Sequence, residues 1–340
     1  MKNEEMPKDN SKRLLAIFVA IMCVIAVGIS GYGIATKIIK NNDKEEKETK
    51  KEEITPLMYK VTKEGSDNVM YLFGSMHIVN FNDFDMPKYV MDAYNESDYL
   101  AVELDVNKYM ENKEIVQLLA LDMIYQDGTT IKNHLDEELY NKLINFLKEK
   151  KLYSQAYESF KPYAIQSLLT SKIATDAGLK KNDGIDSYML SLAKKENKEI
   201  LEIETFEEQW KLTNNAPDKY YELSLISIIE NYDKSVENEK ELYSAWKKGE
   251  PEFLENLLKD EDVTEEYIAK YKLTSNDIKM LEEYSKELIT NRNVKMKNKF
   301  NDYFNDNKKV FYMVGAGHLV GEDGIASLLE NEGYTVTRVK

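Results

Sequence analysis

Two of the three histidines in the chain follow a glycine in the same way, at the end of an apolar run. His77 stands three residues after Gly74, and His318 stands three residues after Gly315. Ligands of α/β sheets bind beyond the carboxyl ends of strands, and glycine permits a sharp turn or a close backbone approach there. The histidine of a single Gly-x-x-His motif usually has no catalytic or binding role. Two in matching settings predict a shared active centre, provided that their strands are neighbours in one sheet.

Glu103 is the carboxylate best placed to join the two histidines. It ends an apolar, β-prone run, where a charged group is costly unless it is exposed or paired. Two histidines and one carboxylate are a common metal-binding set, and a bound metal makes a nucleophile by lowering the pKa of water. We therefore expect a divalent ion on His77, His318 and Glu103, with manganese, cobalt and zinc all open. The alternative is a plain strand-end acid exposed to solvent.

Two further side chains are candidates for the same centre. Glu204 ends the β-prone run of residues 199–203 and is a second strand-end acid. Arg292 is the only arginine between Arg13 and Arg338. Its planar guanidinium suits a carboxylate or an oxyanion better than lysine does. The alternatives are an exposed acid and a cation on the surface of a helix.

Composition argues against several other kinds of site. The sole cysteine, Cys23, lies in an apolar run near the N-terminus, so the rest of the chain has no thiol for a disulfide, a zinc site or a nucleophile. The formal net charge of −15 repels phosphate backbones, and we expect no nucleic-acid partner. Zincin, serine-hydrolase, phosphate-loop and dinucleotide motifs are missing from the sequence, so those classes are unsupported.

Residues 14–36 carry no charged side chain and have basic residues on both sides, which predicts a transmembrane helix over 14–39. A cleaved signal peptide is the alternative, because Gly33-Ile34-Ala35 offers small residues at suitable positions. Residues 1–13 would form a cytoplasmic tail, and residues 40–55, dense in lysine and glutamate, a solvated linker. We expect a single-pass protein of the cell membrane whose large domain is extracytoplasmic.

Residues 56–340 predict an α/β domain. Between about 106 and 304 the apolar spacing is mostly helical, with one strand-like interruption. The β-prone runs lie mainly toward the two ends, at residues 58–62, 69–73, 99–104, 199–203, 309–314 and 334–339. We therefore expect a split mixed sheet built from both chain ends, with a large helical insertion between them.

The candidate residues fall within short motifs that follow one another along the chain in the order seen in a known protein family. The sequence resembles the TraB/PrgY/GumN family, which includes the TIKI membrane-associated metalloproteases. Tyr163 departs from the pattern, because the family often has tryptophan there. The matching pieces cover about residues 56–340 and are, in order, Leu72-Phe73-Gly74-Ser75-Met76-His77, Val102-Glu103-Leu104-Asp105, Lys161-Pro162, Gly184-Ile185-Asp186, Ile203-Glu204-Thr205, Gln209, Ala245-Trp246, Gly249, Arg292-Asn293 and Val314-Gly315-Ala316-Gly317-His318-Leu319 with Gly321 and Gly324.

The resemblance implies an active centre built on the paired Gly-x-x-His motifs and, in the TIKI branch, metal-dependent peptide hydrolysis. His77 and His318 would be metal ligands or catalytic bases, and Glu103 a ligand or general base. Arg292 would stabilise an oxyanion or bind a substrate carboxylate. We therefore expect a peptidase at the extracytoplasmic membrane face. Two alternatives remain open: a protein that binds a signalling peptide without cleaving it, and a metal-free hydrolase with His77 as general base.

Overall fold

The computed structural model describes residues 51–180, 183–214, 216–258 and 265–340. The predicted tail and transmembrane helix, and most of the predicted linker, lie outside these residues. Within the described ranges, no helix is both long enough and apolar enough to cross a bilayer.

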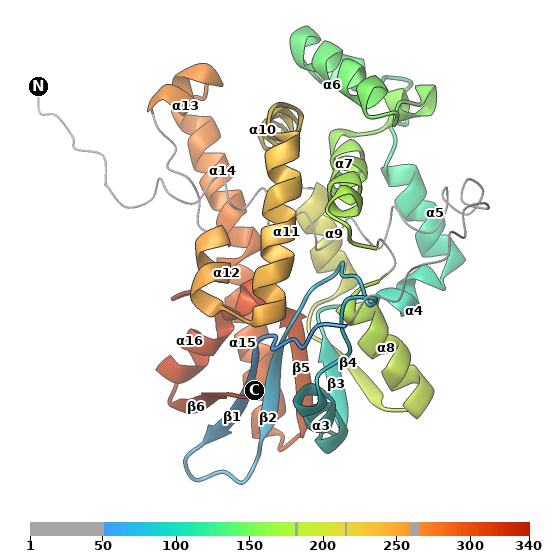
Figure 1. The fold of residues 1–340 in the computed structure, drawn as a ribbon. Coiled ribbons are helices and arrows are strands. Elements are labelled where there is room, and N and C mark those ends of the chain that lie inside the picture. The colour runs from blue at the N-terminus through green and yellow to red at the C-terminus, as the bar shows by residue number, and fades with distance from the viewer. Residues whose placement is uncertain (1–50, 181–182, 215, 259–264) are drawn as a thin grey trace, which may run out of the picture.

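A six-stranded mixed sheet forms the base of the molecule (Figure 1). Its order is β4-β3-β5-β2-β1-β6, so the C-terminal strands β5 and β6 each lie next to strands from the N-terminal part. Strands β2, β3, β4 and β5 pair in parallel, and β1 lies antiparallel between β2 and β6. This confirms the predicted mixed α/β sheet. The strands are β1 (Met58–Lys63), β2 (Met70–Ser75), β3 (Tyr99–Val102), β4 (Glu199–Glu202), β5 (Val310–Gly315) and β6 (Tyr334–Arg338).

The burial of each strand follows its place in the sheet. β5 lies between two parallel neighbours, and its first five residues are all buried, as expected of a strand covered on both faces. β6, at one edge, alternates more exposed with less exposed residues. The parallel strands are added in one direction from β2 to β3 to β4, and the chain then reverses to β5. Right-handed crossovers therefore place α3 (Lys88–Glu96) and α8 (Ile185–Glu196) on one face and α15 (Thr290–Asn305) on the other.

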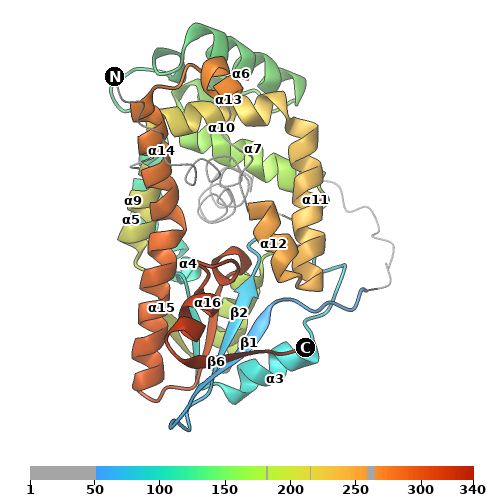
Figure 2. The ribbon, with the colours of Figure 1, turned by 90° about the vertical axis from the view of Figure 1, so that its left-hand side faces the viewer.

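Helices fill most of the chain between β3 and β5, as the sequence predicted. Figure 2 shows α14 and α15 along one side of the molecule, α11 along the other, and α7 and α10 across the end away from the sheet. The remaining elements are α4 (Val106–Met110), α5 (Lys113–Asp122), η4 (Ile131–Asn133), α6 (Glu137–Glu149), η5 (Gln155–Ser159), α7 (Pro162–Asp176), α9 (Phe206–Asn214), α10 (Asp218–Glu230), α11 (Tyr232–Lys248), α12 (Pro251–Leu258), α13 (Glu265–Lys270), α14 (Ser275–Leu288), η6 (Ala316–Leu319) and α16 (Ile325–Asn331).

Three clusters of buried apolar residues occur in the described ranges, and the two largest correspond to this division. The larger one surrounds the sheet and contains residues from both chain ends, such as Leu72 and Phe311. A second core lies among α6, α7, α10 and the start of α11, with Leu143 and Leu225 fully buried in it. Helix α7 contributes to both, since Ala174 belongs to the sheet core and Ile173 to the helical core. The sheet core is the one that carries the predicted centre.

Candidate functional site

The two Gly-x-x-His motifs lie side by side because β2 and β5 are adjacent parallel strands. Gly74 is paired with Val314, and Ser75 with Gly315. Glycine suits position 74, because a Cβ there would lie 3.0 Å from the Cα of Ala316 in the opposing motif, which is closer than an ordinary contact. The prediction that the two strands are neighbours is therefore confirmed, although β2 extends through Ser75 rather than ending at Phe73.

Gly315 marks the point at which the predicted residues meet. A Cβ built on it would lie 3.4 Å from Glu103 Oε1, 3.7 Å from His318 Cδ2 and 3.8 Å from His77 Nε2. Because all three atoms lie within 3.8 Å of one point, the distance between any two of them is at most twice that value. Three side chains that follow β2, β3 and β5 in the sequence thus surround one point at the carboxyl edge of the sheet, where the chain reverses its direction of strand addition.

Glu103 is a buried carboxylate that is fully engaged by the protein. Its Oε1 accepts a hydrogen bond from the Gly315 backbone N–H at 2.7 Å, and its Oε2 accepts one from Arg292 Nη2 at 2.8 Å. Burial raises the pKa of Glu103, but Arg292 and the nearby histidines lower it more, to about 2. Glu103 is therefore anionic at neutral pH.

Arg292 joins the two predicted acids. Its Nε donates to Glu204 Oε1 at 2.7 Å, and its Nη2 donates to Glu204 Oε2 at 2.7 Å while also binding Glu103. Gln209 Nε2 donates a further bond to Glu204 at 3.0 Å. Burial lowers the pKa of Arg292, but the two carboxylates raise it further, so the guanidinium stays charged. Its third nitrogen, Nη1, donates to the Leu288 carbonyl, so each guanidinium nitrogen already has an acceptor within the protein. The expected role of Arg292 in binding a substrate oxyanion stays a prediction.

His77 is held by a carboxylate that the sequence did not assign to the site. Its Nδ1 lies 2.8 Å from Asp186 Oδ2, and Ser75 Oγ donates to Asp186 Oδ1 at 3.0 Å. The Nε2 atom of His77 is buried and has no hydrogen-bond partner among the described residues. Burial lowers the pKa of His77, but Asp186 and then Glu103 outweigh it and raise the pKa to about 9.

Asp186 reaches His77 because α8 begins directly against the first motif. The Ile185 N–H donates to the Met76 carbonyl at 3.0 Å, and a Cβ on Gly184 would lie 2.3 Å from the His77 carbonyl oxygen. The signal for Asp186 was the piece Gly184-Ile185-Asp186, which the family resemblance included without a role. Its spacing from His77 in the sequence gave no indication of contact.

His318 is buried and held in the opposite protonation state. Its Nδ1 lies 2.5 Å from Asn293 Oδ1, and Asn293 Nδ2 is fixed by the Asp323 carbonyl at 2.8 Å. Because an amide oxygen only accepts hydrogen bonds, this contact assigns the proton to Nδ1 and leaves a lone pair on Nε2. Burial, followed by the Arg292 charge, lowers the pKa of His318 to about 3. Its Nε2 lies 3.9 Å from Glu103 Oε1.

The predicted metal ligands lie together without forming a ready-made metal site. In the part of the chain that the structure describes, no group of three or more histidine, cysteine or carboxylate side chains is placed to hold a metal ion. Glu103 is the member that fits least, because Arg292 and the Gly315 N–H already balance it. The two imidazoles fit better, since an Nδ1 bonded to oxygen is usual for histidines that bind a metal through Nε2.

Comparison with known proteins gives the family. Residues 57–338 match the model of the TraB/PrgY/gumN family. The chain belongs to this family. It is also similar to two proteins named uncharacterized protein YbaP, from Escherichia coli strain K12 and Shigella flexneri, with 22% identity over 182 residues in each case. That region is 54% of this chain and 65% of each relative, so less than two thirds of their length is matched. No solved structure matches the chain.

This membership confirms the family resemblance that the ordered motifs indicated. The matched region contains every residue of the centre, from Ser75 to His318. The printed names of the relatives state no activity.

Proposed function

We propose that this centre hydrolyses a peptide bond, with His77 as general acid and His318 as the base that receives a proton from water. The observation that carries the proposal is the buried, unpartnered Nε2 of His77, which faces the same point as His318 and Glu103. Two neighbouring histidines with their pKa values driven in opposite directions are a typical way to provide an acid and a base at one pH.

His77 supplies the proton. Asp186 accepts a hydrogen bond from its Nδ1 and stabilises the imidazolium, so Nε2 carries the hydrogen that is available to a substrate. This role is the reverse of the general base considered from the sequence. The reason is the contact with Asp186, which favours the charged ring.

His318 and Glu103 act together on the attacking water. The Nε2 lone pair of His318 receives a proton as the water oxygen bonds to the carbonyl carbon, and the Glu103 carboxylate stabilises the resulting imidazolium. The carbon–nitrogen bond then breaks as His77 protonates the departing amine. Proton exchange with solvent restores both rings. Glu103 is the poorer candidate for the base, because both of its oxygens already accept hydrogen bonds from the Gly315 N–H and Arg292.

Peptides are the proposed substrates because the family that the chain resembles includes membrane-associated metalloproteases. The proposal also keeps the single-pass membrane anchor over residues 14–39 and an extracytoplasmic position for the centre. Sequestration of a peptide without cleavage is the second candidate, and the same buried Nε2 favours it, because a peptide carbonyl would satisfy that atom.

A divalent ion on His77 and His318 is an alternative form of the hydrolase proposal. When bound there, it would polarise a carbonyl and lower the pKa of a water molecule. The Nδ1 contacts of both rings with oxygen atoms support this form. It would occupy the Nε2 atom of His77 and leave that ring unable to act as an acid, so the two forms are distinguishable.

The test uses the full chain and a peptide library analysed by mass spectrometry. His77→Gln, His318→Gln and Asp186→Asn are each expected to reduce cleavage by about 10²-fold or more. His134→Gln is the matched control, because His134 is exposed and stacks on Tyr125 outside the centre. Bound metal is measured on the same samples by elemental analysis, before and after chelation and titration with manganese, cobalt and zinc.

Each outcome decides between the forms. Cleavage that survives chelation supports the acid and base roles, whereas one metal ion per chain that is lost in His77→Gln and His318→Gln supports the metal-dependent form. Saturable peptide binding without cleavage supports sequestration. Cleavage retained in both histidine variants would contradict the proposed centre.

A further inference from the structure

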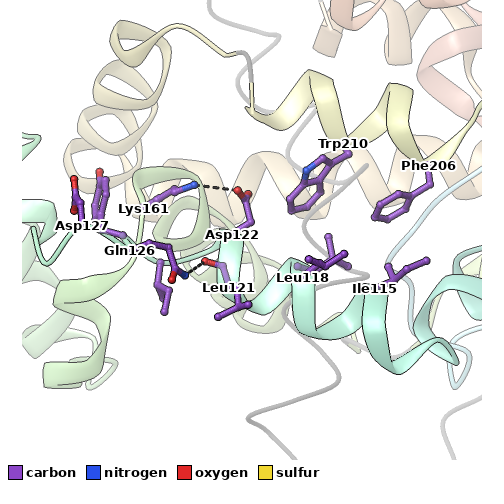
Figure 3. Close-up of a pocket in the computed structure, with 12 residues that line it drawn as sticks. Ile115, Leu118, Leu121, Asp122, Gln126, Asp127, Lys161, Phe206 and Trp210 are labelled. Atoms are coloured by element: carbon purple, nitrogen blue, oxygen red, sulfur yellow. Dashed lines mark hydrogen bonds and ion pairs between the residues drawn. The ribbon is translucent and has the colours of Figure 1, made fainter.

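An apolar groove lies between α5 and α9, apart from the catalytic residues (Figure 3). Its volume is about 710 Å³, within the usual range for pockets that bind small ligands or several side chains. Ile115, Leu118 and Leu121 of α5 line one side, and Phe206 and Trp210 of α9 face them. None of the residues assigned to the centre lines the groove.

The leucines of this groove are unusually exposed. Leu118 is 65% exposed and Leu121 is 43% exposed, while Leu119 between them is buried in the protein. These two are among only five large apolar side chains that are exposed in the described ranges. Burying apolar surface stabilises a protein by roughly 25 cal/mol per Å², and exposed apolar side chains do not contribute this stabilisation. A cluster of exposed leucines therefore indicates a binding surface.

The opposite side of the groove is a row of aromatic rings. Tyr109 stacks on Phe206 at 4.9 Å between ring centroids, and Phe206 stacks on Trp210 at 6.0 Å. With its amide oriented to satisfy both neighbours, Asn214 accepts a hydrogen bond from Trp210 Nε1 at 2.6 Å. The polar atom of Trp210 is thus used by the protein, and its ring presents an apolar surface to the groove.

Polar groups gather at one end of the groove. Asp122 is paired with Lys161 at 3.1 Å and accepts a hydrogen bond from Tyr163 at 3.0 Å. Asp127 lies beyond Lys161 in Figure 3, is exposed and adds a negative charge. The complementary ligand is therefore apolar along the leucines and aromatics, with a basic or neutral group next to Asp127.

Helix α9 links the groove to the catalytic centre. Glu204 precedes it by two residues, and Gln209 on α9 donates to that carboxylate at 3.0 Å. Phe206 and Trp210 on the same helix line the groove. A ligand in the groove therefore contacts the helix that also supports the Glu204, Arg292 and Glu103 cluster.

From these observations we infer that the groove between α5 and α9 binds an apolar segment of the polypeptide substrate, away from the bond that is cleaved. This inference rests on the proposed peptide hydrolysis and names a substrate class: chains with two or three apolar residues beside a basic one. The groove selects such chains by burying their apolar side chains against Leu118, Leu121 and Trp210.

Tryptophan fluorescence of the full chain tests the inference directly. The chain has two tryptophans, and Trp246 is fully buried with its Nε1 bonded to the Gly74 carbonyl, so Trp210 is the one that a ligand in the groove contacts. The probe is a synthetic ten-residue peptide with a Leu-Phe-Leu segment next to one lysine. The matched peptide has serine at the three apolar positions.

The apolar peptide is expected to give a saturable blue shift that is absent with the serine peptide and in Trp210→Phe. Leu118→Asp is expected to weaken binding by about tenfold or more, which corresponds to about 1.4 kcal/mol. Phe253→Asp is the control, because Phe253 is as exposed as Leu121, at 42%, but lies on α12 outside the groove. No shift with the apolar peptide, or equal shifts with both peptides, would overturn the inference.

Two further measurements separate this inference from related ones. A shift produced by phosphatidylglycerol vesicles but not by the apolar peptide would assign the groove to a lipid surface and reject the substrate role. Binding without cleavage would leave the groove assignment standing and reject hydrolysis. Cleavage with an unchanged KM in Leu118→Asp would reject the groove and leave hydrolysis standing.

Discussion

At the scale of single residues, the centre is defined by charges that the protein buries and balances. Arg292 lies between Glu103 and Glu204, and all three side chains are about 5% exposed or less. Burying ions is costly, and apolar groups in their place would often be as stable. Stability alone therefore does not account for the arrangement, whose consequence is that Glu103 is fixed as an anion beside His318.

Replacing Arg292 with methionine is expected to destabilise the fold by about 3–5 kcal/mol, because two buried carboxylates lose their counter-ion. Arg292→Lys keeps the charge but not the fork that binds both oxygens of Glu204, so a smaller loss is expected. The free energy of unfolding is measured by urea titration. Lys295→Met, an exposed position on the same helix, is the control and is expected to change it by about 0.5 kcal/mol or less. Equal effects in Arg292→Met and Lys295→Met would contradict this account.

Glu239 gives the fold a separate pH dependence. It is buried on α11, its Oε1 has no hydrogen-bond partner in the described part of the chain, and burial raises its pKa from 4.5 to about 7. Below pH 4.5 the carboxyl is protonated in both the folded and unfolded states and contributes no difference. Between pH 4.5 and 7 the unfolded state ionises first, so stability falls, and above pH 7 the full cost remains, on the order of 3 kcal/mol.

Glu239→Gln is therefore expected to stabilise the protein above pH 7 and to flatten its stability profile between pH 4.5 and 7. Urea titrations at several pH values measure this. Glu241→Gln, at an exposed position of the same helix, is the control and should leave the profile unchanged. A profile that keeps its slope in Glu239→Gln would show that another group is responsible.

At the scale of secondary-structure elements, the ends of strands could be predicted from sequence, and the helix that completes the site could not. Gly74 and Gly315 follow apolar runs, so the positions of His77 and His318 were readable from local pattern. Asp186 was not, because its contact with His77 joins residues 109 positions apart through the docking of α8. Asn293 was missed for the same reason: only the packing of α15 brings it to His318.

Gly184→Ala tests the docking of α8 on the first motif. The added Cβ would lie 2.3 Å from the His77 carbonyl, so the start of α8 must move and carry Asp186 away from His77. A loss of about 1–3 kcal/mol is expected from this overpacking, together with a loss of cleavage. Unfolding and cleavage assays on the same sample measure both effects.

The control for this change is Gly65→Ala. Gly65 has φ +79°, and no atom of the described residues lies within 4 Å of the added Cβ, so only backbone strain of about 1 kcal/mol is expected and cleavage should be unaffected. If Gly184→Ala also left cleavage intact, the docking of α8 would not be what positions Asp186.

At the scale of the whole molecule, the sequence predicted a sheet from both chain ends but not its order. The β-prone runs indicated six strands, yet only tertiary packing places β5 between β2 and β3. That position is decisive, because it brings Gly315 next to both Ser75 and Glu103. The separate helical core was also beyond the sequence, since amphipathic spacing identifies helices without stating which of them pack together.

The two largest cores predict that the molecule opens in two steps. Leu143 is fully buried among α6, α7 and α10, and it belongs to the helical core rather than to the sheet core. Leu143→Ala is expected to cost about 2–5 kcal/mol locally. Native-state hydrogen exchange should therefore speed up in α6 and α10, while the amides of β2 and β5 keep their protection, because local opening need not involve the central strands.

Leu100→Ala, in the sheet core, is the matched change and is expected to lower the protection of β3 and β5. The centre depends on those strands, so cleavage should fall with Leu100→Ala and persist with Leu143→Ala. Equal acceleration of exchange in β5 by both substitutions would instead mean that the two cores unfold as one unit. In that case Ala174 and Ile173, adjacent on α7 but in different cores, would be the contact that couples them.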